Sequence, residues 1–193
     1  MPLSSAAKRE HIHTRQVECR GFRRADGLWD IEGHLTDVKT YAFPSEFRGT
    51  VEPGDPVHEM WIRLTVDDEL IVRGIEAVTD KSPFPVCGAI ASNFARLVGL
   101  SIRPGFLSKV RERLGGVEGC THLVELMGPI ATTAYQTIYP YRHKLTRESG
   151  EHAPQTVKSG EKPRLIDTCH ALRSDGAVVQ RLWPDFYTGT AKG

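Results

Sequence analysis

The chain has 193 residues, of which 39% are hydrophobic, and this is enough apolar material to bury the core of one compact domain. Its 25 basic residues nearly balance its 24 acidic ones, and the net charge of +1 gives no electrostatic reason to expect nucleic acid or an acidic membrane surface as the partner. No segment resembles a membrane span or the apolar centre of a signal peptide. We therefore expect a single domain over residues 1–193, located in the cytoplasm, whose partner is a small molecule or a metal. A homo-oligomer is an open alternative.

The N-terminal segment, residues 12–37, is typical of a β-hairpin. Its two halves meet at Asp26-Gly27, a strong hairpin signal because both central residues of a type I′ turn need positive φ. Cys19 falls inside the first of these strands, where we expect it to behave as a small buried hydrophobic residue. The next segment, residues 40–56, is dense in proline and glycine, which favours a loop.

A second hairpin is predicted from the alternation of apolar and polar residues on both sides of Asp67-Asp68. A change of alternation near Gly74 predicts a β-bulge in its returning strand. Because successive side chains of a strand point to opposite faces, Glu59 and Trp61 should lie on the outer face. The core face of the first strand should carry His58, Met60, Ile62, Leu64 and Val66.

Three helices are predicted after this hairpin, because apolar residues then recur at intervals of three to four. The first begins near Cys87, the second follows Pro104-Gly105, and the third begins near Cys120 and continues to about Ile138. The positive end of a helix dipole favours a thiolate, so both cysteines are suited to metal binding or nucleophilic chemistry.

The C-terminal part divides into two segments. Residues 139–164 lack an apolar period and predict a mobile loop, whereas residues 165–186 predict a third hairpin that turns at Ser174-Asp175-Gly176. Adjacent Cys169 and His170 would point to opposite faces of a strand there, and their role is left open. The predicted fold class is α+β: an antiparallel sheet of at least six strands built from hairpins, with about three helices packed on one face.

Residues 55–134 resemble the U-type iron–sulfur cluster scaffold proteins, which bind an iron–sulfur cluster or zinc. The resemblance rests on a hairpin, a cysteine before a small-residue helix and a Cys-Thr-x-Leu-x-Glu helix start. It implies a scaffold-like core over residues 55–138, with Cys87 and Cys120 at two of the family's cysteine positions and Glu59 at the position of its aspartate.

Two positions depart from the pattern of that family. Val57 stands where the family has its first cysteine, and Gly119 stands where it has a histidine. The neighbouring His58 and His122 are candidates to replace the missing ligands. The whole chain also resembles a bacterial family of uncharacterised proteins with PxHxM, GCTHL and DxCHA segments, found here at residues 56–60, 119–123 and 167–171.

The first functional hypothesis is a protein that binds zinc or iron. Zinc takes four ligands from thiolates, imidazoles and carboxylates, and two cysteine sulfurs that share one such ion would lie within about 4 Å of each other. Because His58 and Glu59 are adjacent on one strand, both could bind the ion only if the strand is irregular at its start. The residues predicted to bind the metal are His58, Glu59, Cys87, Cys120 and His122.

Two alternatives belong to other classes. A cysteine- or metal-dependent enzyme acting on a small organic substrate could use Cys120 as nucleophile and His122 as base, although two helical positions this close in sequence point apart unless the helix begins later. A small-ligand binding module could place Trp29, Trp61 and Arg63 at the mouth of its site. No phosphate loop or dinucleotide fingerprint is present in the sequence.

Overall fold

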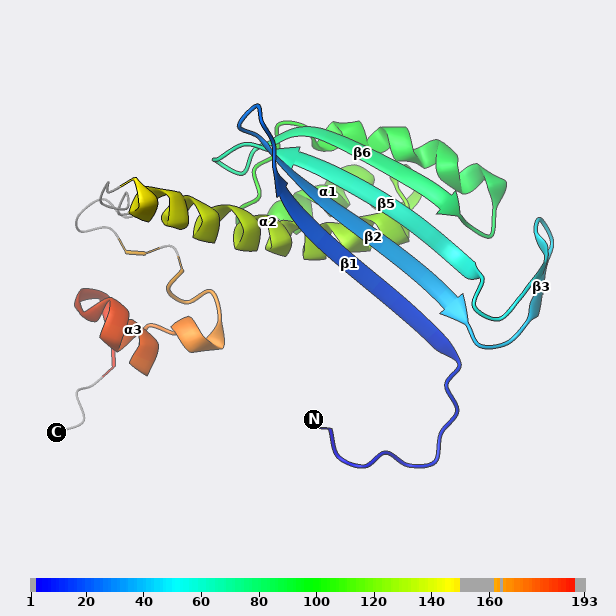
Figure 1. Cartoon of the computed structure of the whole chain (residues 1–193), viewed down its shortest axis with the longest axis horizontal. Coiled ribbons are helices and arrows are strands. Elements are labelled where there is room, and N and C mark those ends of the chain that lie inside the picture. The colour runs from blue at the N-terminus through cyan, green and yellow to red at the C-terminus, as the bar shows by residue number, and fades with distance from the viewer. Residues whose placement is uncertain (1–2, 150–161, 164, 190–193) are drawn as a thin grey trace. The chain divides into compact units, whose positions relative to one another are not determined.

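The computed structural model describes residues 3–149, 162–163 and 165–189 of the chain (Figure 1). The chain divides into two compact units, Met1–Tyr139 and Pro140–Gly193, so the expectation of one domain stays a prediction. The strands, all in the first unit, are β1 (His13–Arg23), β2 (Trp29–Lys39), β3 (Phe43–Ser45), β4 (Gly49–Val51), β5 (Pro56–Val66) and β6 (Val72–Lys81). The helices are η1 (Pro85–Leu97), α1 (Phe106–Leu114), η2 (Gly116–Glu118), α2 (Thr121–Glu148), η3 (His170–Leu172), α3 (Ala177–Leu182) and η4 (Pro184–Phe186).

The main sheet has four antiparallel strands in the order β1-β2-β5-β6. Both hairpins predicted in this region are confirmed, and Gly27 takes the positive φ that its turn requires. The predicted bulge is also confirmed, because the register between β5 and β6 shifts beside Gly74.

The number of strands in one sheet was predicted too high. The main sheet has four strands rather than at least six, and β3 and β4 form a separate two-stranded sheet inside the segment expected to be a loop. Short strands of three residues escape a periodicity argument, because two or three positions cannot establish an alternation. The coarser expectation of an α+β fold with an antiparallel sheet is confirmed.

Alternation along the strands decides which side chains enter the core. On β5 the predicted core face is confirmed, since Met60, Ile62, Leu64 and Val66 are all buried and His58 is half-buried beside them. The same rule applied to β2 gives an inner face of Trp29, Ile31, Gly33, Leu35 and Asp37.

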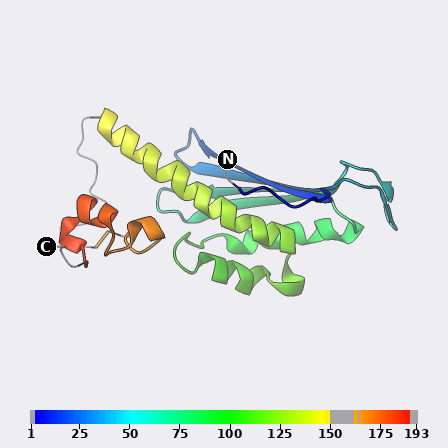
Figure 2. The same cartoon turned by 90° about the horizontal axis from the view of Figure 1, so that it is seen from below.

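Three helices of the first unit lie on one face of the main sheet. Figure 2 shows η1 and α1 below the sheet, as predicted, with α2 crossing the sheet diagonally, and the contacts of Gly21 with Thr137 and of Gly33 with Ile130 place α2 on the same inner face. α1 buries Phe106, Val110 and Leu114, and the inward face of α2 includes Leu126, Ile130 and Ala134. The inner face of the sheet therefore forms a core with these helices, while its outer face is polar.

Two glycines allow α2 to lie close against β1 and β2. A Cβ atom on Gly21 would collide with Thr137, and one on Gly33 would lie 2.7 Å from the Cδ1 atom of Ile130. A larger residue at either position would push the helix away from the sheet, because the core is already filled. This close approach determines where the first turn of α2 lies relative to the strands.

The expected secondary structure of the C-terminal part is wrong. Residues 139–148 continue α2 instead of forming a loop, with Lys144 and Glu148 paired one turn apart, and residues 150–161 and 164 lie outside the described residues. Residues 165–186 form short helices rather than a hairpin. The predicted turn is present, but Asp167 accepts the backbone N–H of Ser174, and Gly176 caps the start of α3 at Ala177. No helix in the described ranges is long and apolar enough to span a membrane.

Candidate metal centre

A row of three polar residues ends the inner face of the main sheet. Arg15 on β1 lies directly opposite Asp37 on β2, and Asp37 lies directly opposite His58 on β5. Directly opposed residues of an antiparallel pair project to the same face, so all three side chains point towards the helices. The neighbouring row along the same strands is apolar and consists of Val17, Leu35 and Met60.

The start of α2 adds a fourth polar side chain above this row. Gly119 is needed just before the helix, because a Cβ atom there would collide with the carbonyl oxygen of Leu114. The carbonyl of Cys120 accepts the N–H of Val124, so the helix begins at Thr121. His122 therefore lies in the first turn, and its Nε2 atom is 3.7 Å from Oδ2 of Asp37.

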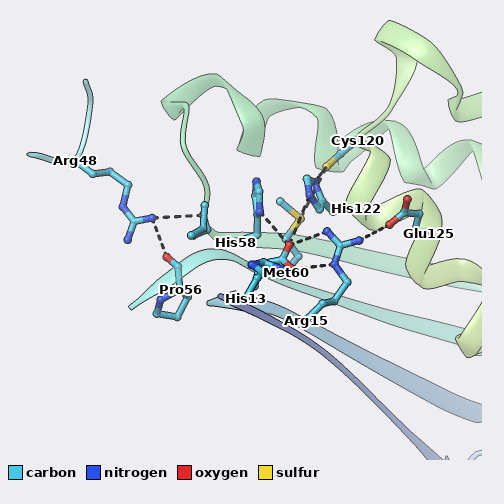
Figure 3. Close-up of polar contacts among 11 residues, drawn as sticks. His13, Arg15, Arg48, Pro56, His58, Met60, Cys120, His122 and Glu125 are labelled. Carbon is cyan, nitrogen blue, oxygen red and sulfur yellow. Dashed lines mark hydrogen bonds and ion pairs between the residues drawn. The ribbon is translucent and has the colours of Figure 1, made fainter. Parts of the chain in front are cut away.

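Asp37 is the centre of the cluster and is only 2% exposed. Arg15 binds both of its carboxylate oxygens, from Nε and Nη2, at 2.8 Å each, while His13 Nε2 lies 3.1 Å from Oδ1 and His58 Nδ1 lies 3.1 Å from Oδ2 (Figure 3). The remaining nitrogen of the guanidinium, Nη1, donates a hydrogen bond to Oε2 of Glu125 on α2 at 2.6 Å. The guanidinium thus links the sheet to the helix, and the buried carboxylate is fully compensated.

Burial has the largest influence on the pKa of each ligand candidate. It lowers the pKa of His58 and of His122, because a buried imidazolium loses hydration; repulsion from the imidazolium form of His122 lowers the pKa of His58 further, and the charge of Arg15 lowers the pKa of His122 further. Burial alone would raise the pKa of Asp37, but the hydrogen bonds and charge of Arg15, helped by His13 and His58, hold it below its ordinary value. These directions favour neutral imidazoles at His58 and His122 beside an ionised Asp37, the forms that bind metal ions.

The geometry of Asp37, His58 and His122 suits one metal ion. One ligand atom from each lies within 4.8 Å of the other two, and the two imidazole rings have their centroids 3.8 Å apart with their planes tilted by 31°. Two ligand atoms on one tetrahedral ion, each at about 2.1 Å from it, are about 3.4 Å apart. Oδ2 of Asp37 lies 3.1 Å from Nδ1 of His58 and 3.7 Å from Nε2 of His122, one distance slightly shorter and the other slightly longer than that value. Small side-chain shifts would therefore complete the coordination.

Cys120 lies on the other side of the His122 ring from Asp37. Its sulfur is 3.8 Å from Nδ1 of His122 and 3.9 Å from the sulfur of Met60. The expected obstacle, that His122 would point away from Cys120, does not arise, because Cys120 precedes the helix and is not on its regular spiral. Cys120 is thus a neighbour of the imidazole rather than a member of the ligand group.

The other two predicted ligands lie elsewhere. Glu59 is on the outer face of β5, where its carboxylate is 3.3 Å from Nε2 of His34 without a hydrogen bond, and His34 stacks on Trp61 at 3.5 Å. Cys87 is the third residue of η1. Among the described residues, the one group that could hold a metal ion is Asp37, His58 and His122, and it contains neither Glu59 nor either of the two cysteines.

The central residue of the cluster, Asp37, was not predicted. A signal existed, because the alternation that begins at Trp29 places Asp37 on the apolar face of β2, where an acid needs a partner. His13 and Arg15 carried no such signal, since β1 is an edge strand with charges on both faces.

Two further expectations are corrected by the positions of the side chains. Trp29 is buried on the inner face, whereas Trp61 and Arg63 are exposed on the outer face, so they do not line one mouth. Cys169 is exposed and precedes η3 instead of lying in a strand with His170.

Comparison with known proteins identifies a family but no activity. Residues 13–136 match the family described as "Protein of unknown function (DUF2889)", which is more than half of the chain, and the chain belongs to that family. The match contains every residue of the Asp37 cluster, whereas the DxCHA segment at residues 167–171 lies outside it. No curated protein and no solved structure matches the chain.

Proposed function

We propose that this protein binds one zinc or iron ion through Asp37, His58 and His122. The observation that carries the proposal is the convergence of three ligand atoms from β2, β5 and α2 within 4.8 Å of one another. On binding, His58 would exchange its hydrogen bond to Asp37 for a bond to the ion, and the ion would bridge the sheet and the helix.

Neighbouring residues supply the support that metal ligands require. Arg15 and His13 hold Oδ1 of Asp37 and orient the carboxylate. With Nε2 of His122 bound to the ion, its Nδ1–H would face the sulfur of Cys120, which fixes the tautomer. The positive charge of Arg15 opposes a cation, but Glu125 is hydrogen-bonded to the same guanidinium and offsets part of that charge.

The ligand types suit a reactive centre better than a closed structural site. Two histidines and one carboxylate are found in catalytic zinc sites and in non-haem iron oxygenases, where open positions bind water or substrate. An iron–sulfur cluster needs thiolates, and oxygen and nitrogen ligands favour a single ion instead. A metal-dependent enzyme acting on a small organic substrate is thus the activity that we propose, with the ion as Lewis acid.

Elemental analysis tests the proposal directly. Protein purified without an affinity tag or chelator should contain about one zinc or iron per chain, and metal-free protein should bind Zn²⁺ or, without oxygen, Fe²⁺ in competition with a chelator. The variant His122→Ala should bind the metal at least about 100-fold more weakly. The matched control is His34→Ala, which removes a half-buried histidine from the other face of the same sheet. Equal affinities in both variants would refute the site.

A second candidate function is thiol-dependent catalysis at the same place. The sulfur of Cys120 lies 3.8 Å from Nδ1 of His122, and Nε2 of His122 lies 3.7 Å from Oδ2 of Asp37. These three side chains have the order of a nucleophile, a base and an orienting acid. The sulfur contact is within the range of a long hydrogen bond to sulfur, whereas the separation between His122 and Asp37 exceeds hydrogen-bond length, as is common before a substrate binds.

Alkylation of metal-free protein by iodoacetamide separates the two functions. If Cys120 is an activated nucleophile, it should react faster than the exposed Cys169, and His122→Ala should slow its reaction. If Cys120 reacts more slowly than Cys169 in the unmodified protein, the thiol function is excluded and metal binding is unaffected.

A further inference from the structure

A cavity of about 310 Å³ lies where the end of β6 meets the start of η1 and the turn of the small sheet. This volume is at the lower end of the range for small-molecule sites. Its lining includes Phe47, Arg48, Thr79, Lys81, Pro83 and Gly88.

Two cations border this cavity. Arg48 is anchored because its Nη1 donates to the carbonyl oxygen of Pro56 at 2.8 Å, and this leaves its other N–H groups available to a ligand. Lys81 is exposed, and its ammonium group has no salt bridge or side-chain hydrogen bond within the described residues. The acid in the lining, Asp80, accepts the indole N–H of Trp61 at 3.0 Å and is thereby held towards the outer face. The lining thus carries two cations and one acid, and Lys81 also lies opposite Glu59 in the register of β5 and β6, so the excess of positive charge at the cavity is small.

The hydroxyl of Thr79 is an unsatisfied group in the cavity wall. Its Oγ1 atom is buried and has no hydrogen-bond partner, which is rare for a buried polar atom. Thr79 lies opposite Met60 in the register of β5 and β6, so its side chain belongs to the inner face that also carries the metal centre. Because Oγ1 is fully covered in this rotamer, the Thr79 side chain would rotate about χ1 to bring the hydroxyl to the cavity, where an acceptor atom of a ligand would satisfy it.

Part of the remaining wall is apolar, although the polar Ser82 also lines the cavity. Phe47 contacts Phe84 edge to face at 6.0 Å between ring centroids, and both rings are more than half exposed. Pro83 lines the same side. An inorganic anion would leave this surface unused, whereas an organic acid would cover it with its hydrocarbon part.

The cavity and the candidate metal centre flank the same stretch of β5. Arg48 anchors the carbonyls of Pro56 and Val57, the two residues before His58 (Figure 3). Thr79, at the other wall, lies opposite Met60, two residues after His58. A ligand in the cavity is thus bound beside the strand that supplies one metal ligand.

We infer that this cavity binds the carboxylate of a small organic acid between Arg48, Lys81 and the hydroxyl of Thr79. The inference rests on the proposed function in one respect: it makes small organic carboxylates the substrate class of the metal centre. The binding step itself requires no metal.

Titration of the full chain, kept metal-free with a chelator, tests the cavity independently of the ion. We use benzoate as the probe, benzamide as its neutral analogue and inorganic phosphate as the competing anion, and follow backbone amide shifts by NMR. Benzoate should bind saturably and at least about tenfold more tightly than benzamide or phosphate, as expected for hydrogen bonds to a charged group. Equal affinity for benzamide or for phosphate would overturn the inference.

Three variants locate the binding. Lys81→Met should weaken benzoate about tenfold, whereas Lys109→Met, which removes an exposed lysine from α1, should not. Gly88 lines the cavity, so a leucine side chain in Gly88→Leu should occupy part of it. The substitution should be tolerated, because no atom lies within 4 Å of the added Cβ and the backbone at Gly88 does not have a positive φ. Thr79→Val should raise the melting temperature of the empty protein and still weaken benzoate. A purely structural role of Thr79 would leave benzoate affinity unchanged.

The same titration with zinc-loaded protein separates this inference from the proposed function. Zinc binding without benzoate binding overturns the cavity and leaves the metal centre intact. Benzoate binding that is lost in Lys81→Met and Gly88→Leu, in a protein that binds no metal, supports the cavity and removes the metal centre.

Discussion

Two buried aspartates of this protein are neutralised in different ways. Asp67, at the turn between β5 and β6, accepts the backbone N–H groups of Glu69 and Ile71 at 3.0 and 2.9 Å and the Nε of Arg73 at 2.7 Å. All three donors lie within six residues of it. Asp37 instead takes its partners from β1, β5 and α2, and each of them is a side chain.

The difference indicates which carboxylate can do chemistry. Backbone donors cannot leave Asp67 without unfolding its turn, so this acid is confined to a structural role. The imidazoles around Asp37 can exchange a hydrogen bond for a metal bond by a change of tautomer, while Arg15 continues to hold the carboxylate. A buried acid whose partners are rearrangeable side chains is therefore a better functional candidate than one that is held by its own turn.

The largest effect should come from removing the charge of Asp37. Asp37→Asn should lower the affinity for Zn²⁺ at least about 100-fold, because an amide oxygen is a poor ligand for this ion compared with a carboxylate. Asp67→Asn should leave the affinity within about twofold. Chelator competition measures both, and a similar loss in the two variants would erase the functional distinction between these acids.

A smaller effect should follow from moving α2. Gly33→Val should cost about 1–3 kcal/mol of unfolding free energy, since the added methyl groups would displace Ile130. Metal affinity should fall with it, because His122 is carried on the same helix. Gly74→Ala on β6 is the control. A Cβ atom at Gly74 would lie 3.7 Å or more from Thr65, an ordinary contact distance, and would meet no atom of α2. Urea unfolding and chelator competition test both variants, and a Gly33→Val protein with unchanged metal affinity would contradict this account of helix placement.

The effect of Cys120 should be smaller still. Cys120 is a neighbour of His122, so Cys120→Ala should reduce zinc affinity about tenfold. This is the lower end of the loss in metal affinity that follows when a residue supporting a metal ligand is removed. Cys87→Ala should leave zinc affinity unchanged, because Cys87 belongs to no ligand group among the described residues. A larger loss in Cys87→Ala than in Cys120→Ala would favour the cysteine ligation implied by the scaffold resemblance.

The smallest effect concerns Asp67 and pH. Burial would raise its pKa, but the hydrogen bonds from Ile71, Arg73 and Glu69 outweigh burial and lower the pKa in the folded protein. The resulting stability is present above the ordinary carboxyl pKa and is lost as the pH falls through the lowered one. Asp67→Asn should therefore cost about 1–2 kcal/mol at pH 7 and little in strong acid. Urea unfolding as a function of pH measures this, and a cost that does not depend on pH would show that charge is unimportant at this turn.

The sequence by itself determined the local features of this protein. Alternation identified both hairpins of the main sheet, the bulge beside Gly74 and the core face of β5, because strand periodicity depends only on neighbouring residues. Helical spacing likewise located α1 and the start of α2. It failed at residues 165–186, where a turn that is compatible with a hairpin begins a helix instead, since the hydrogen bond from Ser174 to Asp167 is not visible in a periodic pattern.

Only the tertiary structure decided which polar residues form the site. His58 and His122 were predicted as ligands, but their common partner is Asp37, and Glu59 is separated from them by the parity of its strand. The reason is physical: strand register aligns Arg15, Asp37 and His58 across three strands, and the glycines beneath α2 set how closely His122 approaches them. Register and helix placement depend on contacts between residues far apart in the chain, which no local pattern records.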